Sequence, residues 1–190
     1  MKKLILFIFI SLMWCNIGFA EDIEEFEIEG ISVGDSLLDY LSKEEITKFN
    51  IDSNKDALFN RIQLLTENYP LLQIYDGMYI YIKRNDKKYI IHGLEGMIDF
   101  PNDITNCKIK KKEILNEISS IFKNSKKTSK DKNNIKDGSG FSRVYVDYIS
   151  ISPNSMYYEL ELGCYDSSEE SGYMDHFRIS LIKDELNATF

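Results

Sequence analysis

Histidine and cysteine, which supply many catalytic groups and metal ligands, are scarce in this chain of 190 residues. The sequence has two histidines, three cysteines and one tryptophan. It contains no glycine-rich phosphate loop, and the His-x-x-x-His and Cys-x-x-Cys spacings of common metal sites are absent. The sequence therefore predicts no cofactor and no metal, and it favours a non-catalytic protein over an enzyme.

Positive charge is also in short supply. Lysine and arginine number 23 against 31 aspartate and glutamate residues, so the formal net charge is −8 at pH 7. A protein with this balance is repelled by the phosphates of nucleic acids and by anionic lipid surfaces. We therefore expect no nucleic-acid partner.

Residues 1–20 have the three parts of a secretory signal peptide. Two lysines precede the apolar run LILFIFISLMW, and Gly-Phe-Ala, ending at Ala20, has the small-x-small pattern of a cleavage site. The apolar run is too short to span a membrane comfortably. We expect cleavage near Ala20 and a single domain over residues 21–190, periplasmic or secreted and without stable membrane insertion. An uncleaved membrane anchor is the alternative.

Cleavage would leave two cysteines, Cys107 and Cys164. Disulfides persist in exported compartments, and each cysteine falls on an apolar face, Cys107 on that of a predicted helix and Cys164 on that of a predicted strand. We predict a Cys107–Cys164 disulfide; two free, buried thiols are the alternative.

Three helices are predicted from capping patterns and apolar spacing. Ser32 with Asp35, and Ser42 with Glu45, have the spacing of capping boxes, which predicts two consecutive short helices near the N-terminus. A long amphipathic helix is expected to follow Asn102 or Asp103, with apolar residues at helical spacing up to Phe122. The lysine-rich residues 123–140 lack aromatic side chains and are predicted to be a flexible loop.

The remaining segments indicate strands. Asp76-Gly77 suits a two-residue turn and predicts a hairpin of residues 71–75 and 78–83. Residues 57–65 are interpreted as a capped helix, with an extended segment as the alternative, and residues 21–29 fit either a short edge strand or a frayed leader. The other predicted strands are residues 88–94, 141–151, 156–164 and 173–182. Together these elements predict an α+β fold, with an antiparallel sheet of two three-stranded meanders packed against the helices.

The first predicted meander is apolar on both faces. One face holds Tyr79, Tyr81, Ile90 and His92. Such a face is either covered by helices or used as a binding surface. These four residues are therefore our candidate binding surface for an envelope or secreted protein, which is the first functional hypothesis.

The second hypothesis is a small hydrolase or metal-assisted enzyme that uses His176. Asp166, Glu169 and Glu170 lie on the loop before it and would have to meet His176 in a cleft. A structural protein with no small-molecule site is a third hypothesis.

The segment EGISVGDSLLDYLSKEEI resembles the start of a group of small, uncharacterised exported bacterial proteins. In that group a Gly-(Ile/Met)-Ser-x-Gly-Asp-Ser-Leu-Leu-Asp-Tyr segment follows the signal peptide. Weaker matches extend through YDGMYIYIKRNDKKY and CYDSSEESGYMDHFRISL. A looser similarity is to small outer-membrane assembly lipoproteins, although Asp39 replaces their closing glycine and no lipobox is present. The resemblance implies export but no activity and no site residues.

Overall fold

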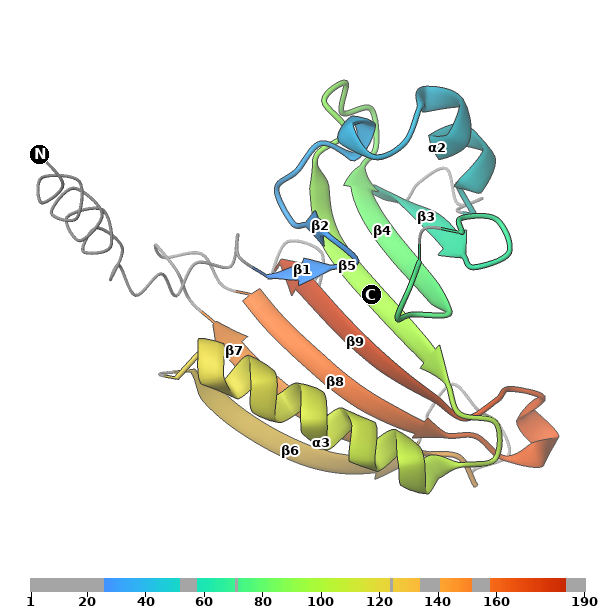
Figure 1. Ribbon diagram of the computed structural model, residues 1–190, viewed down its shortest axis with the longest axis vertical. Helices are drawn as coiled ribbons and strands as arrows, with labels where there is room; N and C mark the ends of the chain where they lie inside the picture. The colour runs from blue at the N-terminus through green and yellow to red at the C-terminus, as the bar shows by residue number, and fades with distance from the viewer. Residues whose placement is uncertain are drawn as a thin grey trace, which may run out of the picture.

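Strands from both halves of the chain form one antiparallel sheet in the computed structural model, which describes residues 26–51, 58–70, 72–123, 125–133, 141–151 and 158–183. The predicted signal peptide and its cleavage site lie outside these residues. The seven strands have the order β3-β4-β5-β9-β8-β7-β6 (Figure 1). They are β3 (Phe59–Leu65), β4 (Gly77–Lys83), β5 (Ile91–Asp99), β6 (Lys126–Asn133), β7 (Arg143–Ile151), β8 (Tyr158–Asp166) and β9 (His176–Lys183). The α+β class is thus confirmed, and these seven strands form one sheet.

Strand β9 joins the two halves of the sheet. It pairs with β5 on one side and with β8 on the other. Leu94, Leu181 and Leu160 lie opposite one another across β5, β9 and β8, and none of the three has any exposed area. These leucines point to the same face, because directly opposed residues in antiparallel strands share a face of the sheet.

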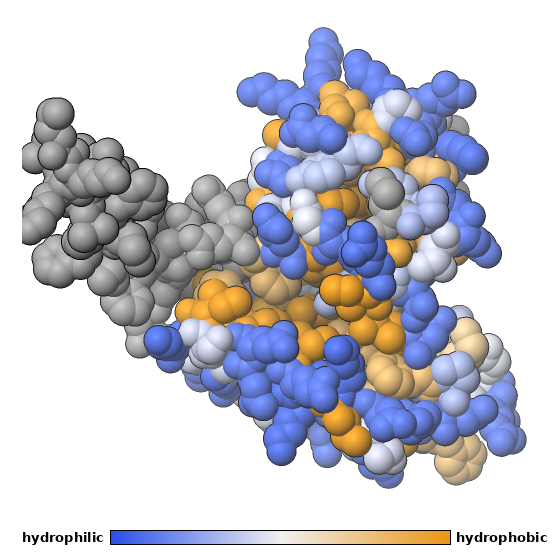
Figure 2. All heavy atoms as spheres, in the orientation of Figure 1, coloured by the Kyte–Doolittle hydropathy of each residue, from blue (hydrophilic) through white to orange (hydrophobic). Residues whose placement is uncertain are grey.

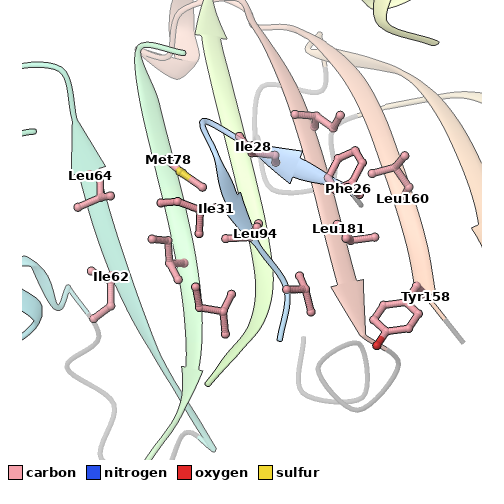
Figure 3. Packing of buried hydrophobic residues seen from close by; sticks show 14 of the residues in the cluster. Phe26, Ile28, Ile31, Ile62, Leu64, Met78, Leu94, Tyr158, Leu160 and Leu181 are labelled. Carbon is pink, nitrogen blue, oxygen red and sulfur yellow. The ribbon is translucent and has the colours of Figure 1, made fainter. Parts of the chain in front are cut away.

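The described helices pack on that leucine-bearing face, which we call the covered face. They are α2 (Lys43–Phe49) and α3 (Ile104–Ile121), joined there by the small sheet of β1 (Glu27–Ile28) and β2 (Ile31–Ser32). Ile28 and Ile31 lie over Met78 and Leu94 of the large sheet (Figure 3). Close-packed aliphatic side chains of this kind supply most of the stabilising burial in a domain of this size.

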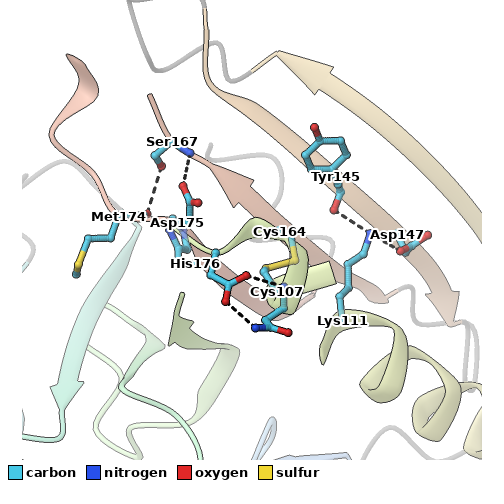
Figure 4. The surroundings of a disulfide bond; sticks show 11 residues. Cys107, Lys111, Tyr145, Asp147, Cys164, Ser167, Met174, Asp175 and His176 are labelled. Atoms are coloured by element: carbon cyan, nitrogen blue, oxygen red, sulfur yellow. Dashed lines mark hydrogen bonds and ion pairs between the residues drawn. A yellow bond between two sulfur atoms is a disulfide. The ribbon is translucent and has the colours of Figure 1, made fainter. Parts of the chain in front are cut away.

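A disulfide ties α3 to the sheet. Cys107 on α3 and Cys164 on β8 are both fully buried, and their sulfurs are bonded at 2.02 Å (Figure 4). One turn further along the helix, Lys111 forms an ion pair with Asp147 of β7 at 2.7 Å. The predicted Cys107–Cys164 disulfide is confirmed.

The two predicted N-terminal capping boxes have different outcomes. Ser42 caps α2 and forms the full reciprocal box with Glu45, as predicted. The prediction for Ser32 is wrong, because Ser32 lies in β2 and Ser36 instead caps a 3₁₀ helix over Leu37–Asp39. Gly34 would lie in the first turn of a helix capped by Ser32, but its φ of 103° is outside the range of a right-handed helix.

Replacing Ser42 by alanine should lower the free energy of unfolding by about 1 kcal/mol, because the Glu45 amide at the helix start loses its acceptor. Urea unfolding of Ser42→Ala against the parent measures the loss. Glu45→Gln keeps a polar side chain that reaches the Ser42 amide and should lose less. Equal stability of Ser42→Ala and the parent would contradict a stabilising cap.

The predicted hairpin at Asp76-Gly77 is wrong. Strand β4 pairs with β3, with Gly77 opposite Leu65, so β3 takes the place given to residues 71–75. The Glu29 carboxylate accepts hydrogen bonds from the amides of Gln73, Ile74 and Tyr75 at 2.7–3.0 Å. These amides are thereby satisfied outside the sheet, and the segment forms a loop.

The lysine-rich segment also differs from its prediction. Lys126–Asn133 forms β6, which pairs with β7 along its whole length, whereas a flexible loop was expected over residues 123–140. Residues 134–140 lie outside the described part of the chain. The backbone pairing with β7 outweighs the low hydrophobicity of the segment.

Candidate functional site

The face of the sheet opposite α3 is the candidate site, and we call it the uncovered face. Both described α-helices and the β1–β2 hairpin contribute side chains to the core on the covered face. On the uncovered face, the buried apolar cluster among the described residues contains only Phe59 and Tyr81, with Tyr79 against it. The strand registers assign Arg61, Tyr79, Tyr81, Glu95, Arg178, Glu161, Tyr165 and His176 to this face.

A charged and aromatic network occupies its centre. Nη2 of Arg178 lies 2.8 Å from Oε1 of Glu161, and the hydroxyl of Tyr165 donates to the same oxygen at 3.0 Å. The Arg178 guanidinium also lies over the Tyr165 ring, 4.7 Å from its centroid. His176 also belongs to the network, because its ring stacks on that of Tyr165 with centroids 4.6 Å apart. Four side chains from β8 and β9 thus hold one another in place.

The Arg178–Glu161 pair is charged and partly shielded from water. The side chains are 29% and 17% exposed, respectively. Burial alone would raise the pKa of Glu161, but the Arg178 guanidinium and the hydrogen bonds from Arg178 and Tyr165 hold that pKa below its ordinary value. The carboxylate is therefore ionised at neutral pH.

Only part of the predicted binding surface of Tyr79, Tyr81, Ile90 and His92 is accessible to solvent. Tyr79 is half-buried, with Arg61 over its ring at 5.2 Å and Gln63 donating to its hydroxyl at 3.1 Å. Tyr81 is 3% exposed and donates to Glu95, itself 8% exposed, at 3.1 Å. Burial, followed by the Glu95 carboxylate, raises the pKa of Tyr81. Tyr81 is thus a packing residue, and Tyr79 is the more exposed of the two tyrosines.

The other two residues of that predicted surface lie at the start of β5. His92 meets Phe59 of β3 edge to face, with ring centroids 5.3 Å apart. Ile90 comes just before the strand and forms a single bridge with Ser36. The connection between β4 and β5 spans residues 84–90, which is longer than the expected turn at residues 84–87, and a bulge at Tyr81 and Ile82 shifts the register further. Neither residue therefore lies opposite Tyr79 or Tyr81.

His176 does not meet the loop carboxylates that the second hypothesis requires. Its Nδ1 lies 3.0 Å from the Met174 carbonyl oxygen, and the neighbouring Asp175 instead accepts from the Ser167 amide (Figure 4). Among the described residues, no hydrogen bond or ion pair joins His176 to Asp166, Glu169 or Glu170. Burial, with Arg178 adding to it, lowers the pKa of His176, so the ring is neutral at pH 7.

Residues 30–34 have the Gly-x-Ser-x-Gly spacing of a nucleophile turn, in which the serine is exposed between a strand and a helix. Here Ser32 is 6% exposed and belongs to the two-residue strand β2. Its amide donates to the Asp35 carboxylate at 3.2 Å. The match in spacing is therefore not a nucleophile turn.

Within the described ranges, no three His, Cys, Asp or Glu side chains lie together as metal ligands. No known protein family, curated protein or solved structure matches the chain. In the same described part, neither α-helix is long and apolar enough to cross a membrane.

A second feature, an apolar groove of about 320 Å³, lies on the covered face. Its walls are Ile114, Ile118 and Ile121 of α3 on one side and Phe26, Ile74 and Tyr75 on the other. Figure 2 shows apolar side chains gathered between α3 and the N-terminal part of the fold. This groove is separate from the uncovered face, since the sheet lies between them.

Sequence reasoning missed three important residues of the uncovered face: Arg61, Tyr165 and Arg178. Alternation along the predicted strands predicts only a solvent-exposed charge ladder, with Arg178 near Glu159 and His176 near Glu161. The local signal is limited to the alternation that places Tyr165 on the same side of its strand as Glu159 and Glu161, because the contact with Arg178 depends on the β8–β9 pairing.

Proposed function

We propose that this is an exported, non-catalytic protein that binds another exported or envelope protein through the uncovered face. The observation that supports this most directly is the one-sided fold. Both described α-helices and the small sheet pack on the covered face. Tyrosine and arginine side chains stand on the other.

The composition of this face favours a protein partner. Tyrosine and arginine are the residues most enriched at the energetic centres of protein interfaces. Tyr79 with Arg61, and Tyr165 with Arg178, place two such pairs on one face. Acidic side chains of a partner would bind the guanidinium groups there, and apolar side chains would pack on the neighbouring aromatic rings.

The pairs are also held in fixed positions before any partner binds. Gln63 donates to Tyr79, while Glu161 accepts from both Tyr165 and Arg178. A surface whose long side chains are already ordered loses less conformational entropy on binding. Rigid anchors therefore favour recognition of a specific partner over loose association.

Export is the second part of the proposal. It is supported by the signal-like residues 1–20 and by the disulfide, because disulfides form and persist in oxidising compartments. The contacts of His176 support a non-catalytic role, since its ring is stacked on Tyr165 and hydrogen-bonded to the Met174 carbonyl oxygen.

Site-specific photo-crosslinking in the source cell tests the proposal. A benzophenone side chain in place of Tyr79 should give a protease-sensitive adduct of discrete mass, whereas the same group in place of the exposed Lys112 on α3 should not. Adding Arg61→Glu should reduce the Tyr79 adduct several-fold, because it reverses a charge beside the crosslinker.

Lys112→Glu, which makes the same charge change on the covered side, is the matched control and should leave the Tyr79 adduct unchanged. No adduct from Tyr79, or equal adducts from Tyr79 and Lys112, would exclude the uncovered face as the binding surface. An adduct that resists proteases would point to an envelope polysaccharide instead of a protein.

A further inference from the structure

The two edges of the sheet differ. At the β3 edge, Asn50 forms a β-bridge with Ile62, and the Ile51 amide donates to the Arg61 carbonyl at 3.0 Å. At the other edge lies β6, whose ladder partner is β7. Among the described residues, no backbone hydrogen bond outside the sheet ladder ends on β6. Strand β6 thus presents a row of backbone amides and carbonyls along its outer side.

Charge is strongly segregated at this end of the molecule. Residues 108–133, which include most of α3 and all of β6, contain nine lysines and three acidic residues, a net charge of +6. Since the whole chain carries −8, the rest of it carries −14. The α3–β6 end is therefore a basic region on an acidic protein.

On β6 the lysines are exposed and regularly placed. The register with β7 assigns Lys126, Lys130 and Lys132 to the uncovered face and Lys127 to the covered face. The Nζ atoms of Lys130 and Lys132 lie 5.5 Å and 5.9 Å from the ring centroid of Tyr148, and Lys132 donates to the Tyr148 hydroxyl at 3.1 Å. Tyr148 thus holds two of these ammonium groups beside the open edge.

We propose that the outer edge of β6 accepts an extended acidic segment of a partner protein as an additional antiparallel strand. The main-chain groups of β6 supply the hydrogen bonds of strand addition. Aspartate or glutamate at alternating positions of the partner would lie opposite Lys126, Lys130 and Lys132, where cross-strand pairs of opposite charge are stabilising.

The same lysines favour an acidic strand over a second copy of β6 as the partner at this edge. Lysines on an edge strand discourage pairing between copies, since like charges directly opposite one another repel. A second β6 would bring such lysines together, so another copy of this chain is a poor partner. With an acidic strand, the repulsion between lysines is replaced by attraction between lysines and carboxylates. This inference does not depend on the proposed function, because β6 is distant in strand order from Tyr79 and Arg61.

A defined peptide tests the proposal. The peptide Glu-Val-Glu-Thr-Glu-Val-Glu-amide with fluorescein on its N-terminus should bind the intact protein in an anisotropy titration at low salt. Hydrogen exchange should show slower exchange of β6 amides in the complex. The same peptide N-methylated at every peptide nitrogen keeps its charge but donates no hydrogen bonds, and it should bind at least roughly tenfold more weakly.

Two charge-reversal variants locate the contact. Lys130→Glu/Lys132→Glu should weaken peptide binding by roughly tenfold or more. Lys110→Glu/Lys112→Glu on α3 makes the same net charge change and should alter it by less than about twofold. Unfolding midpoints of both variants, measured in parallel, separate loss of the contact from loss of the fold.

Three results would overturn strand addition at β6. They are equal binding of the N-methylated peptide, equal losses in the two charge-reversal variants, and no peptide binding by the parent. Sedimentation of the parent with phosphatidylglycerol vesicles in the absence of peptide binding would assign the basic end to a lipid surface instead. None of these results depends on crosslinking at Tyr79, so this proposal and the proposed function fail independently.

Discussion

Reducing the Cys107–Cys164 disulfide should lower the free energy of unfolding by about 4 kcal/mol, the largest effect that we expect from a single bond in this protein. The two cysteines are 57 residues apart, so the bond restricts a long loop in the unfolded chain. Both are fully buried, which means that reduction removes a constraint without exposing new groups in the folded state. Guanidinium chloride unfolding with and without dithiothreitol measures the difference.

The double variant Cys107→Ala/Cys164→Ala provides the control. It should be destabilised about as much as the reduced parent, and dithiothreitol should not alter its unfolding midpoint. If the reduced parent unfolds at the same denaturant concentration as the oxidised parent, the disulfide does not stabilise the fold by restricting the unfolded chain.

Glu161→Gln should lower the free energy of unfolding by about 3 kcal/mol, because the partly buried Arg178 guanidinium loses the carboxylate to which it is hydrogen-bonded. The Tyr165 hydroxyl also loses a charged acceptor. Glu159→Gln is the matched control on the same strand and face and should cost less than about 0.5 kcal/mol. Equal losses in the two variants would mean that the pair makes no special contribution.

The same carboxylate predicts a pH dependence. Because the pKa of Glu161 is lowered in the folded state, its stabilising contribution is complete above the ordinary value of 4.5. That contribution is lost as pH falls through the lowered folded-state pKa. The parent should therefore lose stability more steeply with acid than Glu161→Gln does, as unfolding midpoints measured from pH 7 down to pH 3 would show. If stability falls equally with pH in the parent and in Glu161→Gln, protonation of Glu161 does not cause the loss of stability in acid.

Local patterns in the sequence predicted local structure well and strand partners poorly. The Ser42–Glu45 box and the start of α3 at Asp103 depend on neighbouring residues, and both are present. The hairpin at Asp76-Gly77 failed because Glu29, more than forty residues away in sequence, satisfies the amides of residues 73–75. Strand β6 was missed because only its pairing with β7 makes such a lysine-rich segment extended.

The candidate site shows the same division. Alternation along one strand correctly placed Tyr79 and Tyr81 on a common face. They were expected to lie beside Ile90 and His92, whereas the structure pairs them with Glu95 and Gly93, because the connection between β4 and β5 is longer than the predicted turn and a bulge beside Tyr81 adds a further shift. Arg178, Glu161 and Tyr165 come together only through the β8–β9 pairing. No pattern within either strand specifies that contact.

The position of β9 has a consequence for how the chain reaches its folded state. It is the last described strand, yet it lies between β5 and β8. Until it is available, β3-β4-β5 and β6-β7-β8 are two separate three-stranded pieces, each with an unpaired edge. A polypeptide emerging from a ribosome therefore cannot complete this sheet until the residues of β9 have emerged. The order of synthesis thus makes pairing of the two halves through β9 a late event.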